Sequence, residues 1–231
     1  LPAKLGGAAI RHLEAFAPDA DALAEALGMD PALAAIVYPR VVEKLQREPV
    51  EDFRIDFEDG YGIRPDVEED VQAVRCAAEL AEAVGSRTAP PFFGIRIKNL
   101  GPEMAGRALR TLDLFVTGLV AASGGQVPAG FVVTVPKITS AAQVTAVASA
   151  CDLLEQRLGV EAGSIKLELM IELPQSLLDP EGRCVLPDLV NAARGRCTGA
   201  HFGTYDYTAS VNITAAHQVM DHPSCAFALQ L

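Results

Sequence analysis

Three features are missing from this sequence, and each absence excludes a class of protein. No apolar run approaches the ~20 residues that a membrane-spanning helix needs. The 231 residues include 19 Lys and Arg against 30 Asp and Glu, which gives a formal net charge of −11. An acidic surface repels phosphate backbones and anionic headgroups, so the charge disfavours partners such as nucleic acids and membranes.

A disulfide or zinc framework is also missing. The five cysteines are scattered and odd in number, and none forms a C-x-x-C pair: Cys76, Cys151, Cys184, Cys197 and Cys225. This pattern predicts reduced, mostly buried thiols in a cytoplasmic protein. Soft ligands do not cluster near the candidate site described below, which argues against structural zinc there.

Five apolar, strand-like runs dominate what is present: residues 53–59, 92–98, 131–137, 166–172 and 200–206. Each has a charged residue at or near its end, and these markers recur at intervals of 34 to 41 residues: Glu58, Arg96, Lys137, Glu172 and Asp206. Such spacing is typical of strand–helix units in a parallel α/β barrel, where polar residues at the carboxyl ends of strands converge on one active-site face. We therefore predict a (β/α)₈ TIM barrel with one polar rim.

The barrel is expected to be incomplete in this chain. A closed barrel needs about 250 residues, and only about five units are clear. Residues 1–50 are predicted to form a helical segment packed on the barrel, and residues 51–231 to form the partial barrel with the active site. In the helical segment, residues 20–27 end at Gly28, a good C-cap, and a second helix over 31–47 should be kinked or split by Pro39.

Glu172 and Asp206 are the sharpest pair of candidate ligands. Each is predicted to end a strand, and the two strands are consecutive, so the carboxylates should lie side by side. Two carboxylates with waters and a substrate oxygen suit Mg²⁺, which rarely has an all-protein cage. The alternative is a surface carboxylate and a loop cap.

Arg96 offers a rigid fork for a substrate carboxylate or phosphate, or else a salt bridge to Asp56 or Glu58. Alternation along the first run places Asp56 and Glu58 on one side and Asp59 on the other. Carboxylates this crowded need a cation, an arginine or shared protons. The acidic group could orient water ligands of a metal, or it could be a solvated loop.

Lys137 ends the third run and could hold substrate or bridge carboxylates; a Schiff-base role is less compatible with so many acidic neighbours. Lys98 could belong to the site or reach into the following loop. Gly203 and Thr204 could present backbone donors near Asp206. His201 is interpreted as a packed histidine.

These runs resemble ordered motifs of the HpcH/HpaI aldolase and citrate lyase beta-subunit family, which is similar to malyl-CoA and citramalyl-CoA lyases. The matching segments are residues 56–60, 94–97, 135–137, 170–174 and 203–206. The resemblance implies an oligomeric (β/α)₈ barrel, a trimer or hexamer, whose strands two to six are the five runs. It also implies Mg²⁺, or Mn²⁺, on Glu172 and Asp206, substrate binding by Arg96, and a catalytic acidic pair at Glu58 and Asp59.

The function that follows is a Mg²⁺-dependent carbon–carbon lyase or aldolase. Its substrate would be a 2-oxo acid or a malyl-type or citramalyl-type acid, possibly a CoA thioester, cleaved through a metal-stabilised enolate. Arg96, Glu58, Asp59 and Lys137 are the candidate catalytic residues, and Arg96, Gly203 and Thr204 the candidate substrate-binding residues. Phosphoenolpyruvate-type phosphoryl chemistry and a non-catalytic binding protein are the alternatives.

Overall fold

The computed structural model describes residues 2–231, which alternate between helices and strands from residue 52 onward. In chain order the principal elements are α1 (Pro2–Phe16), α2 (Ala20–Leu27), α3 (Pro31–Arg47), β1 (Asp52–Asp56), α4 (Asp66–Gly85), β2 (Phe92–Arg96), α5 (Ala105–Ala122), β3 (Phe131–Val135), α6 (Ala141–Leu158), β4 (Lys166–Ile171), α7 (Leu186–Ala192), β5 (Cys197–Phe202), α8 (Thr204–Ser210) and α9 (Pro223–Gln230). Two single-turn 3₁₀ helices lie at Pro174–Ser176 and Ala215–His217. Among the helices of this described part, none is long and apolar enough to cross a membrane.

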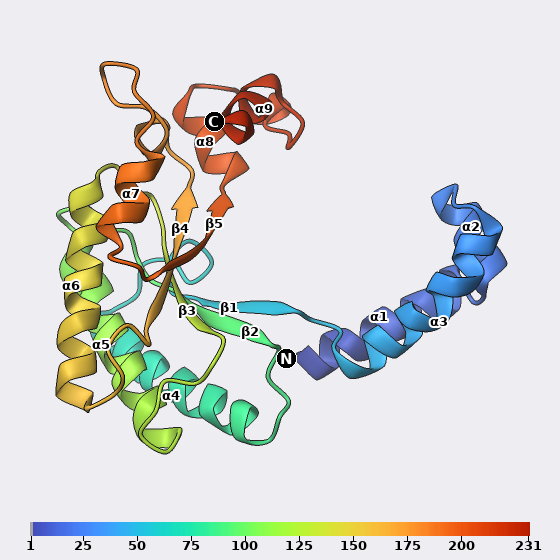
Figure 1. Cartoon of the computed structure of the whole chain (residues 1–231), viewed down its shortest axis with the longest axis horizontal. Helices are drawn as coiled ribbons and strands as arrows, with labels where there is room; N and C mark the ends of the chain where they lie inside the picture. The colour runs from blue at the N-terminus through green and yellow to red at the C-terminus, as the bar shows by residue number, and fades with distance from the viewer. Residues whose placement is uncertain (1) are drawn as a thin grey trace. The chain divides into compact units, whose positions relative to one another are not determined.

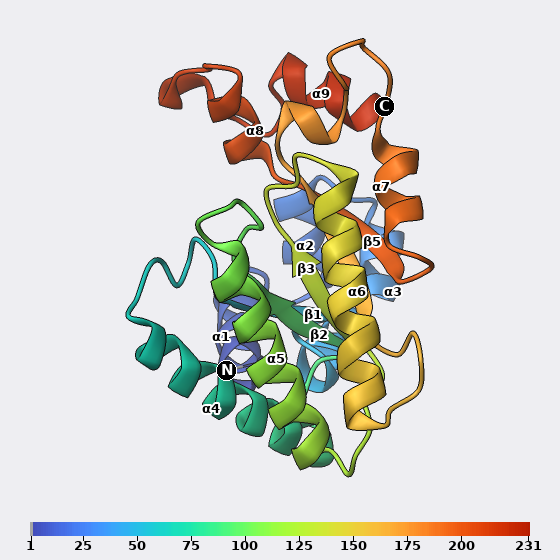
Figure 2. The same ribbon diagram turned by 90° about the vertical axis from the view of Figure 1, so that its left-hand side faces the viewer.

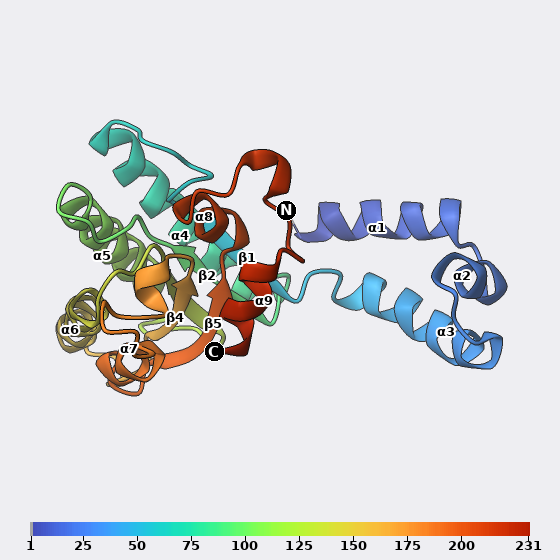
Figure 3. The same ribbon diagram turned by 90° about the horizontal axis from the view of Figure 1, so that it is seen from above.

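The chain divides into two compact units. One comprises the chain up to Phe53 together with Gly85–Phe93, and the other comprises Arg54–Val84 and Gly94–Leu231. In the first unit, α1 and α3 lie side by side and α2 packs on α3 (Figure 3). The predicted C-cap is confirmed, since Gly28 ends α2 at φ 61°.

Of the two effects predicted for Pro39, a kink or a split in the second helix, the split does not occur. Helix α3 runs as one element from Pro31 to Arg47 with Pro39 inside it. A proline in a helix interior removes one hydrogen bond and costs about 3 kcal/mol. The start of α3 offsets part of this, because Asp30 accepts a hydrogen bond from Leu33 N–H at 3.0 Å and Pro31 occupies the first turn. Packing against α1 and α2 stabilises the rest.

A five-stranded sheet forms the centre of the second unit, in the order β1-β2-β3-β4-β5. Strands β3, β4 and β5 pair in parallel. The same direction holds for β1 and β2, because Phe92 N–H donates to Glu51 C=O and Phe57 N–H to Arg96 C=O. The predicted α/β class and βα alternation are confirmed. The described residues do not form a closed eight-stranded barrel, so the complete barrel stays a prediction.

Helices α4, α5, α6 and α7 follow one another across one face of this sheet (Figures 1 and 2). All five residues of β3 are buried, as expected for a central parallel strand. Helix α5 buries a stripe that includes Phe115, whose ring stacks on Phe131 at 6.0 Å between centroids. Each such side chain stabilises the fold by about 1.5–3 kcal/mol, so the core fixes the strand ends on which the candidate site lies.

The fifth predicted run is misplaced by a few residues. Residues 200–206 were expected to form the strand, but β5 spans Cys197–Phe202 and helix α8 begins at Thr204. Gly203 lies between them and donates its N–H to Ile171 C=O at 2.9 Å, which completes the pairing with β4. Asp206 is therefore in the first turn of α8 and not at a strand end.

Candidate functional site

The predicted acidic pair lies in the loop that follows β1. The Lys137 ammonium contacts both carboxylates, with Nζ 2.8 Å from Glu58 Oε1 and 2.7 Å from Asp59 Oδ2. The expected placement of Asp59 opposite Asp56 and Glu58 is wrong, because Glu58 and Asp59 face the same lysine. Strand β1 ends at Asp56, so the alternation of a strand no longer applies two and three residues later.

Lys137 bridges carboxylates, which is one of the two roles that its position suggested. Its Nζ also lies 3.7 Å from Asp206 Oδ2. Burial acts to lower the pKa of the Lys137 ammonium, but hydrogen bonds to Asp59 and Glu58 outweigh it and raise the pKa. The side chain therefore remains protonated at neutral pH, which is unfavourable for Schiff-base chemistry.

Glu172 directly follows β4 and is fully buried. Its Oε1 accepts a hydrogen bond of 2.6 Å from the Lys137 main-chain N–H. Its Oε2 is buried and has no hydrogen-bond partner among the described residues. Burial raises the pKa of Glu172 to about 7, and the neighbouring Asp206 carboxylate contributes in the same direction.

Gly203 leaves the space that Glu172 occupies. A Cβ at position 203 would lie 2.5 Å from Glu172 Cβ and 2.7 Å from Oε2, closer than real contacts allow. The turn at Gly203 then leads into α8 and directs Asp206, whose side chain is 38% exposed, toward Lys137. Thr204 begins the same helix, and its C=O accepts a hydrogen bond from Thr208 Oγ1 at 2.8 Å.

The donor set of Glu172 and Asp206 fits a hard divalent cation. An ionised carboxylate with one oxygen buried and unpaired is costly, and a second carboxylate beside it adds repulsion. A cation at this position would offset both effects. Carboxylate oxygens with water positions on the exposed Asp206 side are what Mg²⁺ or Mn²⁺ prefers.

Arg96, the last residue of β2, is held by a two-pronged contact with Asp56. Nε lies 2.7 Å from Asp56 Oδ1, and Nη2 lies 2.5 Å from Oδ2. This hydrogen bonding raises the pKa of the guanidinium. The remaining nitrogen, Nη1, lies 3.6 Å from Glu58 Oε2 and 3.7 Å from Met170 Sδ. Both salt bridges considered for Arg96 are therefore present, and they orient Nη1 toward the acidic pair.

A second polar layer lies further back along the strands, and it was not predicted from the sequence. Glu168 Oε2 accepts hydrogen bonds from Thr134 Oγ1 at 2.8 Å and from Arg54 Nε and Nη2 at 3.2 Å. Glu168 Oε1 lies 2.9 Å from His201 Nε2. Burial acts to raise the pKa of Glu168, but the hydrogen bonds from His201 and Thr134 lower it to about 2. Strand alternation could have predicted it, because Arg54 lies two residues before Asp56 and Glu168 four residues before Glu172, which places each pair on the same side of its strand.

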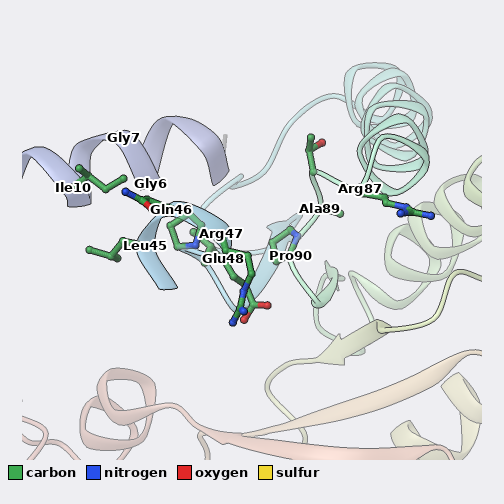
Figure 4. A pocket seen from close by; sticks show the side chains of 13 residues that line it. Gly6, Gly7, Ile10, Leu45, Gln46, Arg47, Glu48, Arg87, Ala89 and Pro90 are labelled. Carbon is green, nitrogen blue, oxygen red and sulfur yellow. The ribbon is translucent and has the colours of Figure 1, made fainter. Parts of the chain in front are cut away.

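Two cavities, each large enough to hold a small ligand, differ in their relation to the predicted site residues. One of about 240 Å³ adjoins the acidic pair and is lined by Glu58, Asp59, Gly62, Ile63, Lys98, Asn99, Met104 and Lys137. The other, of about 360 Å³, lies in the first unit between α1, the end of α3 and residues 87–90 (Figure 4). The predicted site residues are not among those that line the second cavity.

Comparison with known proteins gives a family and a fold. Residues 1–231 match the family model described as Domain of unknown function (DUF6986). Among curated proteins, none matches the sequence.

Two solved structures of malate synthase from Haloferax volcanii are similar in fold. The lead(II) complex has 16% identity and a TM-score of 0.55, and the match covers 77% of this chain and 48% of that one. The native enzyme at 3 mM glyoxylate has 17% identity and a TM-score of 0.50, with 71% and 45% covered. This chain thus spans about half the length of the solved structures that it matches.

Proposed function

We propose that this chain, which belongs to the family described as Domain of unknown function (DUF6986), is part of a divalent-metal-dependent enzyme that forms or breaks a carbon–carbon bond of a small 2-oxo acid. The observation that carries the proposal is Glu172, a buried carboxylate with one unpartnered oxygen beside Asp206. This arrangement suits Mg²⁺ or Mn²⁺.

Two independent likenesses support the same class of chemistry. The strand-end motifs resemble those of the HpcH/HpaI aldolase and citrate lyase beta-subunit family. The similar solved structures are malate synthases, and one of them was solved at 3 mM glyoxylate, the simplest 2-oxo acid. The shared substrate class is an acid with an oxygen on the adjacent carbon, which can chelate a divalent cation.

Each residue of the site has a role in this proposal. Glu172 and Asp206 hold the cation, which when bound supplies positive charge next to the 2-oxo group and the developing enolate. Gly203 keeps open the space for the Glu172 carboxylate. Arg96, oriented by Asp56, directs Nη1 toward the substrate oxygens and stabilises their negative charge.

Proton transfer is assigned to the acidic pair and its lysine. Burial raises the pKa of Glu58, so this carboxylate is a better proton acceptor than an exposed one. Lys137 holds Glu58 Oε1 at 2.8 Å and limits repulsion from Asp59. In enolisation of a 2-oxo acid with a hydrogen on C3, such as pyruvate, that C–H bond breaks and its electron pair forms the enolate, with the negative charge on the 2-oxo oxygen. The proton passes to Glu58 directly or through one water.

The test separates metal binding from turnover. Mn²⁺ affinity is measured by calorimetry for the full-length protein and for Glu172→Gln, with Glu103→Gln, an exposed carboxylate in the same unit, as the matched control. We expect Glu172→Gln to weaken Mn²⁺ binding at least about tenfold, or roughly 1.4 kcal/mol, and the control to leave it unchanged. Exchange of solvent deuterium into the methyl group of pyruvate, followed by NMR with Mg²⁺ present, then reports enolisation.

Equal Mn²⁺ affinity in the wild type and Glu172→Gln would overturn the metal assignment. Metal binding without any exchange, and without condensation or cleavage of a 2-oxo acid, would favour a non-catalytic binding protein.

A further inference from the structure

We propose that Lys98 is a positioning residue that fixes the loop of residues 57–62 and thereby sets where the carboxylates of Glu58 and Asp59 lie. The inference rests on the proposed function, in which these carboxylates move a proton. Lys98 follows β2 by two residues and is buried, with 4% of its surface exposed. It borders the 240 Å³ cavity next to the acidic pair.

The ammonium group of Lys98 is fully used within the protein. Nζ donates to Phe57 C=O at 2.7 Å and to Gly62 C=O at 3.1 Å, and it lies 2.7 Å from Glu69 Oε2. Two of the three N–H donors of the ammonium thus serve the two carbonyls, and its charge is paired with the Glu69 carboxylate. Lys98 therefore does not reach for substrate; it binds the two ends of the 57–62 loop.

The loop's own hydrogen bonds hold only part of it. Asp56 accepts from the N–H groups of Glu58 at 2.9 Å and Gly60 at 2.7 Å, and Gly62 N–H donates to Glu58 C=O at 2.7 Å. These contacts shape the turn but connect it only to itself and to the end of β1. Phe57 N–H also donates to Arg96 C=O at 2.9 Å, which ties the first residue of the loop to β2. Lys98 adds a contact to that residue and ties Gly62, the last residue, to the segment that follows β2.

Glu69 anchors Lys98 to the helices. It is fully buried on α4, and its Oε1 accepts a hydrogen bond from Thr111 Oγ1 of α5 at 2.6 Å. Arg107 Nε lies 3.4 Å from the same oxygen. A buried ion pair is weak as a source of stability, because desolvation offsets most of the attraction, but it can specify one geometry. Here the geometry specified is that of the loop carrying the acidic pair.

The experiment compares Lys98→Met with Arg196→Met in the full-length protein. Arg196 is a matched control because it is also a buried cation, with Nη1 2.6 Å from Glu155 Oε1 and 3.0 Å from Ile165 C=O. It precedes β5, at the opposite end of the strands from the acidic pair. Both variants should lower the melting temperature. Only Lys98→Met should lower the kcat for deuterium exchange into pyruvate, by at least about tenfold, while KM and Mn²⁺ affinity stay within about twofold.

An unchanged kcat in Lys98→Met, or an equal fall in both variants, would overturn the assignment. Lys98→Arg covers the case in which the methionine variant does not fold, because it keeps a charge beside Glu69. Its larger planar group cannot contact both carbonyls and Glu69 from the same position, so its kcat should also fall.

A second readout does not depend on the proposed function. Amide hydrogen exchange should become faster in residues 57–62 of Lys98→Met and Lys98→Arg, and not in those residues of Arg196→Met. If the wild type shows no exchange into pyruvate, the proposed reaction fails, and this measurement alone decides the role of Lys98. Unchanged amide exchange in the loop would then refute it.

Discussion

The main-chain N–H of Lys137 donates a 2.6 Å hydrogen bond to Oε1 of Glu172. Lys137 makes this contact from a left-handed backbone conformation, with φ 48°. Residues other than glycine adopt that conformation at a cost of roughly 1–2 kcal/mol, and such strain persists only where the surrounding structure enforces it. One residue thus serves both halves of the site, with its backbone on the candidate metal ligand and its ammonium on Glu58 and Asp59.

Replacing Lys137 with glycine and with alanine should separate its backbone from its side chain. Both variants lose the ammonium and its ion pairs, but only glycine adopts φ 48° without strain. We expect Lys137→Gly to be more stable to urea than Lys137→Ala, by about 1 kcal/mol. Equal unfolding free energies would mean that the left-handed conformation relaxes when the side chain is removed.

Gly203→Ala should damage the metal site specifically. The added methyl group would lie 2.5 Å from Glu172 Cβ, so the carboxylate has to move, at a cost of about 1–3 kcal/mol in stability. We expect Mn²⁺ affinity to fall at least about tenfold. Gly106→Ala in α5 is the matched control, because nothing lies within 4 Å of the position that its Cβ would take; it should leave Mn²⁺ binding unchanged and stabilise the helix slightly.

Glu168 should make the fold sensitive to acid. Its folded pKa of about 2 lies below the ordinary value of 4.5, so its contribution is present above pH 4.5 and is lost as the pH falls from there toward 2. The shift corresponds to roughly 3 kcal/mol at most. Glu168→Gln should therefore destabilise the protein at pH 7, and the difference from wild type should shrink steadily below pH 4.5. Urea unfolding across this range, with Glu103→Gln as control, measures it; a difference independent of pH would contradict the assignment.

Much of the fold follows from short-range patterns in the sequence. The β3 residues Phe131–Val135 are apolar on both faces, and this requires a strand covered on both sides. Strands β1 to β4 begin within one residue of the predicted runs. The position of the fifth strand was predicted wrongly because Thr204, Tyr205 and Asp206 look like the end of a strand. In the structure, Gly203 makes the last hydrogen bond to β4, through Ile171, and α8 begins at the next residue.

The sequence predicts that the candidate site residues lie close together, but not which contacts they make. Charged residues at parallel strand ends must meet at one edge, so the nearness of Glu58 to Lys137 could be inferred. Both Asp56 and Glu58 were candidate partners of Arg96, and the two-pronged contact with Asp56 rather than with Glu58 depends on side-chain rotamers. The left-handed backbone at Lys137 depends on the tertiary contact with Glu172, and no local sequence pattern predicts it. The sequence leaves the role of Lys98 open, because its contacts come from two separate segments, the loop of residues 57–62 and Glu69 on α4.

Strand β4 carries Glu168, and Glu172 follows it four positions later on the same face. The pKa of the first is about 2 and that of the second about 7, so their affinities for a proton differ by roughly 10⁵. Two chemically identical side chains, one on β4 and one directly after it, thus differ in their affinity for a proton. At pH 6 a proton binds Glu172 in preference to Glu168, which stays ionised at that pH.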